Sequence, residues 1–138
     1  MKSKDLILLN KILEYCNQAE EARAMFNNEY SSFVEKSVFR NACCMCILQI
    51  GELCKLISDD LKYEEKCVPW KSWCGIRDIF AHQYSNLDYQ SAWETIQYDL
   101  PELKENIERI IKVSKGFFCE ILRLLGKVTG ILDGVIIN

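Results

Sequence analysis

Apolar residues recur every three or four positions along most of the chain, which is the period of an α-helix. In the segment from about Lys4 to Phe26, the repeat includes Leu9, Cys16 and Met25. This spacing predicts one helix that buries a single apolar face. The repeat resumes near Phe33 and continues to Leu61, which predicts a second helix.

Turn and capping residues predict three more helices. Val68-Pro69-Trp70 begins a helix that continues to Ala81, because proline is favoured in a first helical turn, where its missing N–H would have no partner. Asp88 is expected to cap a short fourth helix that carries Trp93. The sequence Asp99-Leu100-Pro101-Glu102 fits a capping box, and it predicts that a fifth helix begins at Asp99.

These elements predict an all-α fold, an antiparallel bundle of about five helices joined by short polar turns. No segment has the alternating pattern of a strand, and no internal repeat occurs. We expect the bundle to occupy residues 1–115. Residues 116–138 form an apolar C-terminal extension, in which glycine recurs at 126, 130 and 134 and charged residues interrupt the apolar run. The sequence assigns no role to this extension, and we expect it to be loosely ordered or docked on a partner.

The composition agrees with one helical domain and narrows the class of protein. The 138 residues include only six glycines and two prolines, too few for the many turns of an all-β sandwich. The formal charge of −3 excludes a globally basic nucleic-acid binder, so any RNA contact needs a local basic site, for which Lys66 and Lys71 are candidates. We find no signal-peptide pattern and no apolar run long enough to span a membrane. These features predict a cytoplasmic protein.

The eight cysteines raise the question of metal or redox chemistry. Cys43, Cys46, Cys67 and Cys74 could supply four thiolates to zinc. However, Cys43 and Cys46 lie within the predicted second helix, on its apolar stripe. Structural zinc pairs usually lie on turns, and six residues separate Cys67 from Cys74 instead of about two to four. We therefore expect reduced cysteines that pack in the core, with no metal and no cofactor.

The single histidine, His82, lies in the sequence Arg77-Asp78-Ile79-Phe80-Ala81-His82-Gln83-Tyr84. On a helix, Asp78 and His82 share a face, whereas Arg77 lies about 140° round from His82 unless the helix ends near Ala81. A guanidinium binds phosphate oxygens in a bidentate manner, and an imidazole transfers protons near neutral pH. The pair therefore suits phosphate-ester chemistry, although spacing alone favours a plain surface pair of Asp78 and His82.

A larger set of ordered motifs surrounds this segment. It comprises Arg40-Asn41-Ala42, Ile50-Gly51-Glu52-Leu53, Val68-Pro69-Trp70, Gly75-Ile76-Arg77-Asp78, His82-Gln83-Tyr84, Trp93 and Leu100-Pro101-Glu102-Leu103. Together with the R-x4-H-x-Y pattern of Arg77 to Tyr84, this set resembles the HepT-type toxins of the HEPN superfamily. The resemblance extends over roughly residues 4–115.

The resemblance implies a helical bundle that forms a homodimer and brings two R-x4-H motifs together in a cleft. Such proteins are typically metal-independent endoribonucleases, paired with a minimal nucleotidyltransferase antitoxin. Carried onto this chain, Arg77 would bind the scissile phosphate of an RNA substrate, and His82 would act as general base or acid while a ribose 2′-hydroxyl attacks phosphorus. Tyr84 matches the tyrosine that the antitoxin modifies with AMP, and an anionic adduct there would block the cleft.

Two further residues and one rival function complete the predictions. Asp78 stands where the family commonly has asparagine, and its carboxylate would orient His82 but repel RNA phosphates. Glu52 is a weaker candidate, either a supporting group near the motif or a solvated helix glutamate. The acidic charge also leaves open a non-catalytic module that binds a nucleotide or partners a nucleotidyltransferase.

Overall fold

The computed structural model describes the backbone of residues 1–82 and 88–129, and the side chains of these residues apart from 77–79, 81, 82 and 127–129. All regular structure in this part of the chain is helical, so the predicted all-α class is confirmed. In chain order the elements are α1 (Ser3–Met25), α2 (Tyr30–Glu35), α3 (Ser37–Leu56), α4 (Asp59–Glu64), α5 (Trp70–His82), α6 (Tyr89–Glu94), the π-helical turn η2 (Thr95–Asp99) and α7 (Leu100–Thr129).

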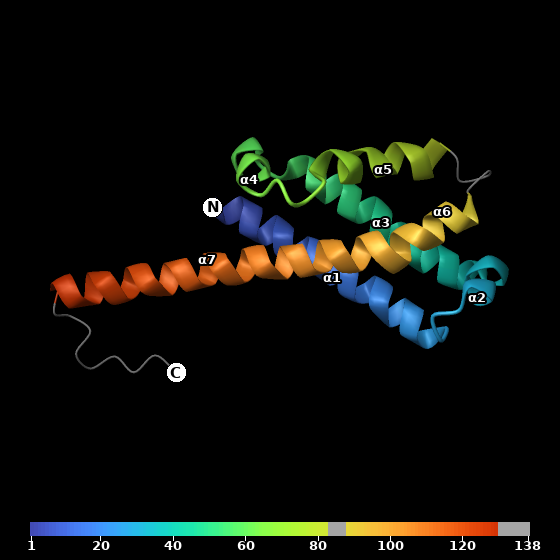
Figure 1. Cartoon of the computed structure of the whole chain (residues 1–138), viewed down its shortest axis with the longest axis horizontal. Helices are drawn as coiled ribbons and strands as arrows, with labels where there is room; N and C mark the ends of the chain where they lie inside the picture. Colours follow the sequence, from blue (N-terminus) through green and yellow to red (C-terminus); the bar gives the residue numbers. More distant parts are fainter. Residues whose placement is uncertain (83–87, 130–138) are drawn as a thin grey trace.

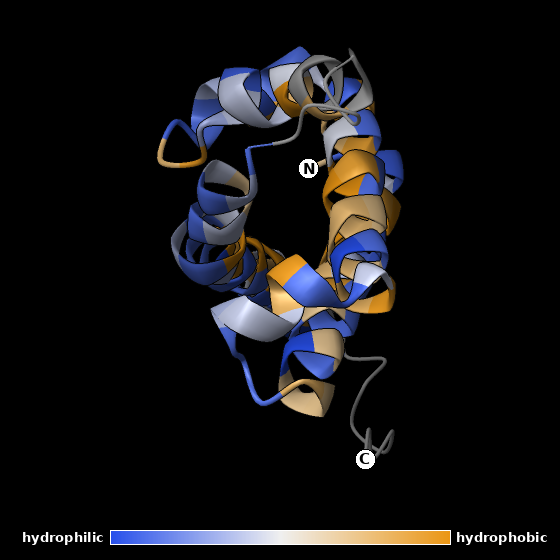
Figure 2. Cartoon of the chain, turned by 90° about the vertical axis from the view of Figure 1, so that its right-hand side faces the viewer, coloured by the Kyte–Doolittle hydropathy of each residue, from blue (hydrophilic) through white to orange (hydrophobic). Residues whose placement is uncertain are grey.

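The bundle is built around α3, which packs against both α1 and α5, while α7 packs against α1 (Figure 1). The short helices α2 and α6 lie together at one end (Figure 1). Seen end-on, the helices carry both hydrophobic and hydrophilic residues, as amphipathic bundle helices do (Figure 2). Burying one Leu or Ile side chain contributes about 1.5–3 kcal/mol, so the apolar faces supply most of the stability. Fully buried side chains include Leu9, Ile12, Phe39, Ile47, Ile50 and Ile107.

The first predicted helix agrees with α1 within one residue at each end, but one of its predicted core residues is wrong. Met25 is 72% exposed. It is the last residue of α1, and the chain then reverses through Asn27 and Asn28, whose φ angles of 54° and 49° are left-handed. Phe26 packs against the core instead and stacks on the buried ring of Phe39, with ring centroids 4.7 Å apart.

The single helix predicted over residues 33–61 is wrong, because the chain forms α2, α3 and α4 there. Lys36 has an extended backbone, with φ −104° and ψ 103°, and separates α2 from α3. Ile57 is also extended, with φ −60° and ψ 137°, and ends α3. Phe33, Ile57 and Leu61 are all buried, so the apolar period continues through both breaks and conceals them.

A buried acid of α1, Asp5, holds the start of α4. Asp5 is 2% exposed, and its carboxylate accepts hydrogen bonds from the backbone nitrogen of Ser58 at 2.9 Å and from Ser58 Oγ at 2.6 Å. Ser58 Oγ in turn accepts from the backbone nitrogen of Leu61 at 3.3 Å, as an N-cap side chain does. Asp5 therefore links the first turn of α1 to the first turn of α4.

The predicted cap at Asp88 is confirmed. Its carboxylate accepts hydrogen bonds from the backbone nitrogens of Gln90 and Ser91 at 3.1 and 3.4 Å, and from Ser91 Oγ at 2.7 Å. These bonds lower the pKa of the Asp88 carboxyl below its ordinary value, with the Ser91 hydroxyl as the largest cause. The chain therefore enters α6 at a well-defined residue.

The capping box predicted at Asp99 is wrong, because the backbone stays helical from α6 through η2 into α7. In η2 the backbone N–H of Leu100 donates to the carbonyl of Thr95, five residues earlier. Pro101 has no N–H, and in a regular α-helix its ring would clash with the carbonyl four residues before it. A π turn immediately before the proline accommodates the ring without ending the helix.

Helix α7 continues to Thr129, so residues 116–129 of the expected extension are helical. This part of α7 extends past the other helices (Figure 1). Its apolar side chains are exposed, namely Phe117, Phe118, Ile121, Leu122, Leu124 and Leu125. Within the described residues, no helix is both long and apolar enough to cross a membrane. The domain boundary at residue 115 stays a prediction.

Candidate active site

The predicted catalytic residues lie on the last turns of α5. This helix packs against α3 and is anchored in the core by Trp73 and Phe80, which are 3% and 4% exposed. Pro69 immediately precedes the helix, and the predicted start of this element is confirmed.

The α5 backbone is helical as far as His82, its last residue. Asp78 and His82 are therefore one turn apart on one face, whereas Arg77 is about 140° round the helix from His82. The side chains of these three residues lie outside the described residues, as does the whole of Tyr84. Their roles in catalysis and modification stay predictions.

The chain beyond the motif is held by α6 and an aromatic cluster. Tyr89 and Trp93 pack against Phe33, with ring centroids 6.3 and 5.3 Å away. Arg40 lies over the Tyr89 ring at 4.8 Å and donates to the carbonyl oxygen of Phe33 at 3.1 Å. The interval that contains Tyr84 is thus flanked by two packed helices, α5 before it and α6 after it.

Glu52 lies on α3, the helix against which α5 packs. Its side chain is 42% exposed and pairs with Lys55, with 3.1 Å between the Lys55 Nζ and Glu52 Oε1 atoms. The residue therefore lies at the edge of the solvent, on a helix that contacts α5. Its role as a supporting group stays a prediction.

A basic hollow, defined by Lys62, Lys66 and Lys71, opens beside the first half of α5. It has a volume of about 500 Å³. Helix positions 71, 74, 78 and 82 follow one another at intervals of three or four residues, so they share one face of α5. The hollow therefore lies along the face that carries the positions of Asp78 and His82. The structure brings the two predicted lysines, Lys66 and Lys71, together, and adds Lys62, which the sequence did not single out.

The cysteines of the possible zinc motif have separate environments. Cys43 and Cys46 are 0% and 5% exposed, which confirms that they pack in the core. Burial raises the pKa of the Cys43 thiol to about 12 and that of Cys46 above its ordinary value, so both stay protonated at neutral pH. At the surface, Arg109 donates to Cys67 Sγ at 2.9 Å. Among the residues whose side chains are described, no three metal-ligating groups converge.

The fold and these positions define an all-α protein that carries an Arg/His motif and a basic hollow along the same helix, a combination suited to phosphate-ester chemistry. Residues 12–110 match the family described as Ribonuclease HepT-like. The chain belongs to this family, and so to the ribonuclease class of enzymes. The family resemblance carried by the ordered motifs is confirmed.

Several curated proteins are similar to this chain. "Putative RNase MJ1216" of Methanocaldococcus jannaschii is 35% identical over 117 residues, which cover 84% of this chain and 95% of that protein. "Putative RNase MJ1380" of the same organism is 30% identical over 109 residues, which cover 78% and 98% respectively. "Probable ribonuclease HepT" of Thermococcus cleftensis is 35% identical over 63 residues, which cover 46% and 57%. No solved structure matches the chain significantly.

Proposed function

We propose that this chain is the toxin of a toxin–antitoxin pair and that it cleaves RNA as a metal-independent endoribonuclease. Membership of the HepT-like ribonuclease family supports the reaction class. The observation that carries the proposal is the position of Arg77 and His82 on the last turns of α5, the helix whose first half lines the basic hollow. The hollow supplies local positive charge, which a chain with a net charge of −3 needs in order to bind RNA phosphates.

In this mechanism the nucleophile belongs to the substrate. His82 accepts the proton of a ribose 2′-hydroxyl, and the oxygen attacks the adjacent phosphorus. The bond between phosphorus and the 5′-oxygen of the next nucleotide breaks, and a protonated imidazole donates a proton to that leaving oxygen. Arg77 stabilises the negative charge that develops on the non-bridging phosphate oxygens. The products are a 2′,3′-cyclic phosphate and a 5′-hydroxyl.

A homodimer would supply the pair of imidazoles that this proton transfer uses. Within one chain, the positions of Arg77 and His82 are about 140° apart around α5, so they do not share a helix face. Two copies of the motif in one cleft would combine an arginine and a histidine from different subunits. Asp78, one turn before His82, would orient the imidazole and limit the affinity for RNA by repulsion.

The antitoxin in this proposal is a minimal nucleotidyltransferase that attaches AMP to the Tyr84 hydroxyl. Tyr84 follows His82 by two residues, so the adduct would add a phosphate charge close to the catalytic groups. That phosphate would compete with RNA for Arg77, and the adenosine would occupy space in the cleft. Modification would therefore inhibit cleavage without unfolding the protein.

Cleavage of RNA by the full chain, purified without antitoxin and shown by intact mass to carry no adduct, tests the proposal. The wild type is expected to cleave RNA in the presence of EDTA, whereas Arg77→Ala and His82→Ala lose activity by about a hundredfold or more. Arg123→Ala is the matched control, because Arg123 is an exposed arginine on the far part of α7. Circular dichroism would verify that each variant is folded. Intact RNA across a broad substrate panel would overturn the enzyme and favour the non-catalytic module.

A further inference from the structure

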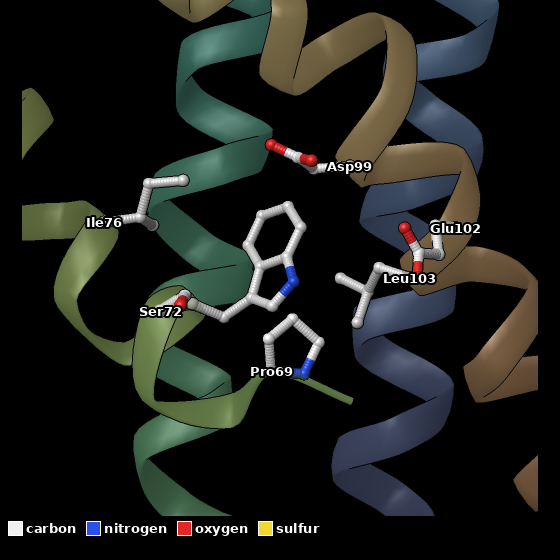
Figure 3. A pocket seen from close by; sticks show the side chains of 7 residues that line it. Pro69, Ser72, Ile76, Asp99, Glu102 and Leu103 are labelled. Atoms are coloured by element: carbon white, nitrogen blue, oxygen red, sulfur yellow. The ribbon is translucent and has the colours of Figure 1, made fainter. Parts of the chain in front are cut away.

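A second hollow, which we call the Trp73 pocket, lies between α5 and the junction of η2 with α7. Figure 3 shows Ser72 and Ile76 of α5 facing Asp99 and Glu102 across it. The pocket has a volume of about 200 Å³. Its full lining is Pro69, Ser72, Trp73, Ile76, Asp99, Glu102 and Leu103.

The indole N–H of Trp73 gives this pocket a buried hydrogen-bond donor. Trp73 is 3% exposed, and no described residue accepts a hydrogen bond from its Nε1 atom. Among the described side chains, every nitrogen or oxygen atom that is fully buried has a hydrogen-bond partner. The Nε1 atom of Trp73 has none, so it is not fully buried, and we infer that it opens into the pocket that Trp73 lines. Trp70 on the same helix differs, because its Nε1 atom donates to the carbonyl of Glu65 at 3.0 Å. A ligand that accepts from Trp73 would satisfy a donor that the described residues leave without a partner.

Two carboxylates lie across the pocket from α5. Asp99 and Glu102 are exposed and are three residues apart on continuous helical backbone, so they share a face. Neither side chain forms an ion pair or hydrogen bond with a described residue. The pocket therefore presents one donor and two carboxylate acceptors between apolar walls.

We propose that the Trp73 pocket binds a guanine base of single-stranded RNA. Guanine carries the acceptor O6 next to two donors, N1–H and N2–H, so it can accept from the indole and donate both protons to one carboxylate. Adenine, cytosine and uracil do not have two adjacent donors beside an acceptor. A Lys or Arg side chain offers donors only, and it would leave the indole N–H without an acceptor. Proteins commonly read unpaired RNA bases by such contacts to their hydrogen-bonding edges, with aromatic and apolar side chains against their faces.

The position of the pocket suits a base next to the cleavage site, and this part of the inference rests on the proposed function. Ile76 of the pocket wall immediately precedes Arg77. His82 follows Ile76 by six residues, which is about 9 Å along the helix axis. A short run of nucleotides spans this distance. Pro69 lines both the Trp73 pocket and the basic hollow, so base contacts and phosphate contacts of one strand can meet there.

Binding to the pocket can be measured without catalysis. In the 15N-labelled full chain, the indole N–H resonance of Trp73 is identified by its loss in Trp73→Phe. GMP is expected to shift this resonance, and AMP, CMP and UMP to bind at least about tenfold more weakly. IMP, which lacks the N2 amino group, is expected to bind more weakly than GMP. Because one carboxylate accepts both guanine protons, at least one of the variants Asp99→Asn and Glu102→Gln is expected to weaken GMP binding about tenfold or more.

Glu105→Gln is the matched control, because Glu105 is an exposed carboxylate on α7 that does not line the pocket, and this variant should bind GMP like the wild type. Equal shifts with all four nucleotides, or no shift with any, would overturn the proposal. A shift with N-acetyl-arginine amide but not with GMP would also overturn it, since the pocket would then fit a basic side chain of a protein partner. RNA cleavage without GMP binding would refute only the pocket. GMP binding without cleavage would refute only the proposed function.

Discussion

Replacing Asp5 by alanine is expected to destabilise the protein by about 2–4 kcal/mol. The Asp5 carboxylate is 2% exposed and accepts two hydrogen bonds from Ser58, at 2.9 and 2.6 Å. A hydrogen bond to a charged group contributes about 1.5–3 kcal/mol, but burial has already removed the hydration of the carboxylate. The net loss is therefore smaller than the sum of two such bonds. Ser58 also loses the group that holds it at the cap of α4.

Urea unfolding followed by far-UV circular dichroism measures this loss. Asp5→Asn keeps the shape and one carbonyl acceptor, so it is expected to lose about half as much stability. Asp60→Ala is the matched control, because this carboxylate is 79% exposed and forms a surface ion pair with Lys2. It should change the free energy of unfolding by less than about 0.5 kcal/mol. The reasoning is refuted if Asp5→Ala unfolds within about 0.5 kcal/mol of the wild type.

The same unfolding assay tests two more predictions. Gly75→Ala is expected to add about 0.5–1 kcal/mol, because Gly75 lies inside α5 and an added Cβ meets no atom within 4 Å; a loss of stability would contradict this. Ile107→Ala removes a fully buried side chain and should lower the free energy of unfolding by about 2–5 kcal/mol. Phe118→Ala, at a site 62% exposed, should lower it by less than about 0.5 kcal/mol. Equal losses would contradict the burial pattern of α7. Hydrogen bonds lower the pKa of Asp88, so its carboxyl stabilises the fold above its ordinary pKa of 3.8 and loses this effect as the pH falls below that value. Asp88→Asn should therefore lose less thermal stability than the wild type between about pH 5 and about pH 3, and an equal loss would refute that role.

Features that depend on neighbouring residues could be predicted from the sequence. The apolar period of α1 and the Pro69 start of α5 are local signals, and the structure has both elements. Asp88 caps α6 because its side chain needs only the backbone N–H groups that follow it. The family resemblance likewise depends on ordered short motifs, and it drew attention to Arg77 and His82, which the structure places on one helix, α5.

Features that depend on distant residues or on backbone detail could not be predicted. The breaks at Lys36 and Ile57 interrupt the helix but not the burial pattern, so periodicity does not detect them. The Asp99 capping box failed because a π turn lets Pro101 follow α6 without a new helix start.

Two buried polar groups were missed for a related reason. Asp5 has its partner at Ser58, 53 residues further along the chain. In the sequence, Trp73 is one more apolar position of a helical repeat. Its Nε1 atom becomes part of a polar pocket only because the fold brings Asp99 and Glu102 across from α5. Tertiary packing, which no short sequence window contains, defines both sites.

The chemistry of the product ends tests the proposed ribonuclease most directly. The adduct-free full chain would be incubated with RNA in EDTA, and the fragments analysed by mass spectrometry. The wild type is expected to form a 2′,3′-cyclic phosphate and a 5′-hydroxyl. Neither product end is expected with the His82→Ala variant. Neither is expected when the substrate carries a 2′-deoxy nucleotide at the cleavage site. Cleavage of the 2′-deoxy substrate, or fragments with a 5′-phosphate, would contradict attack by the 2′-hydroxyl.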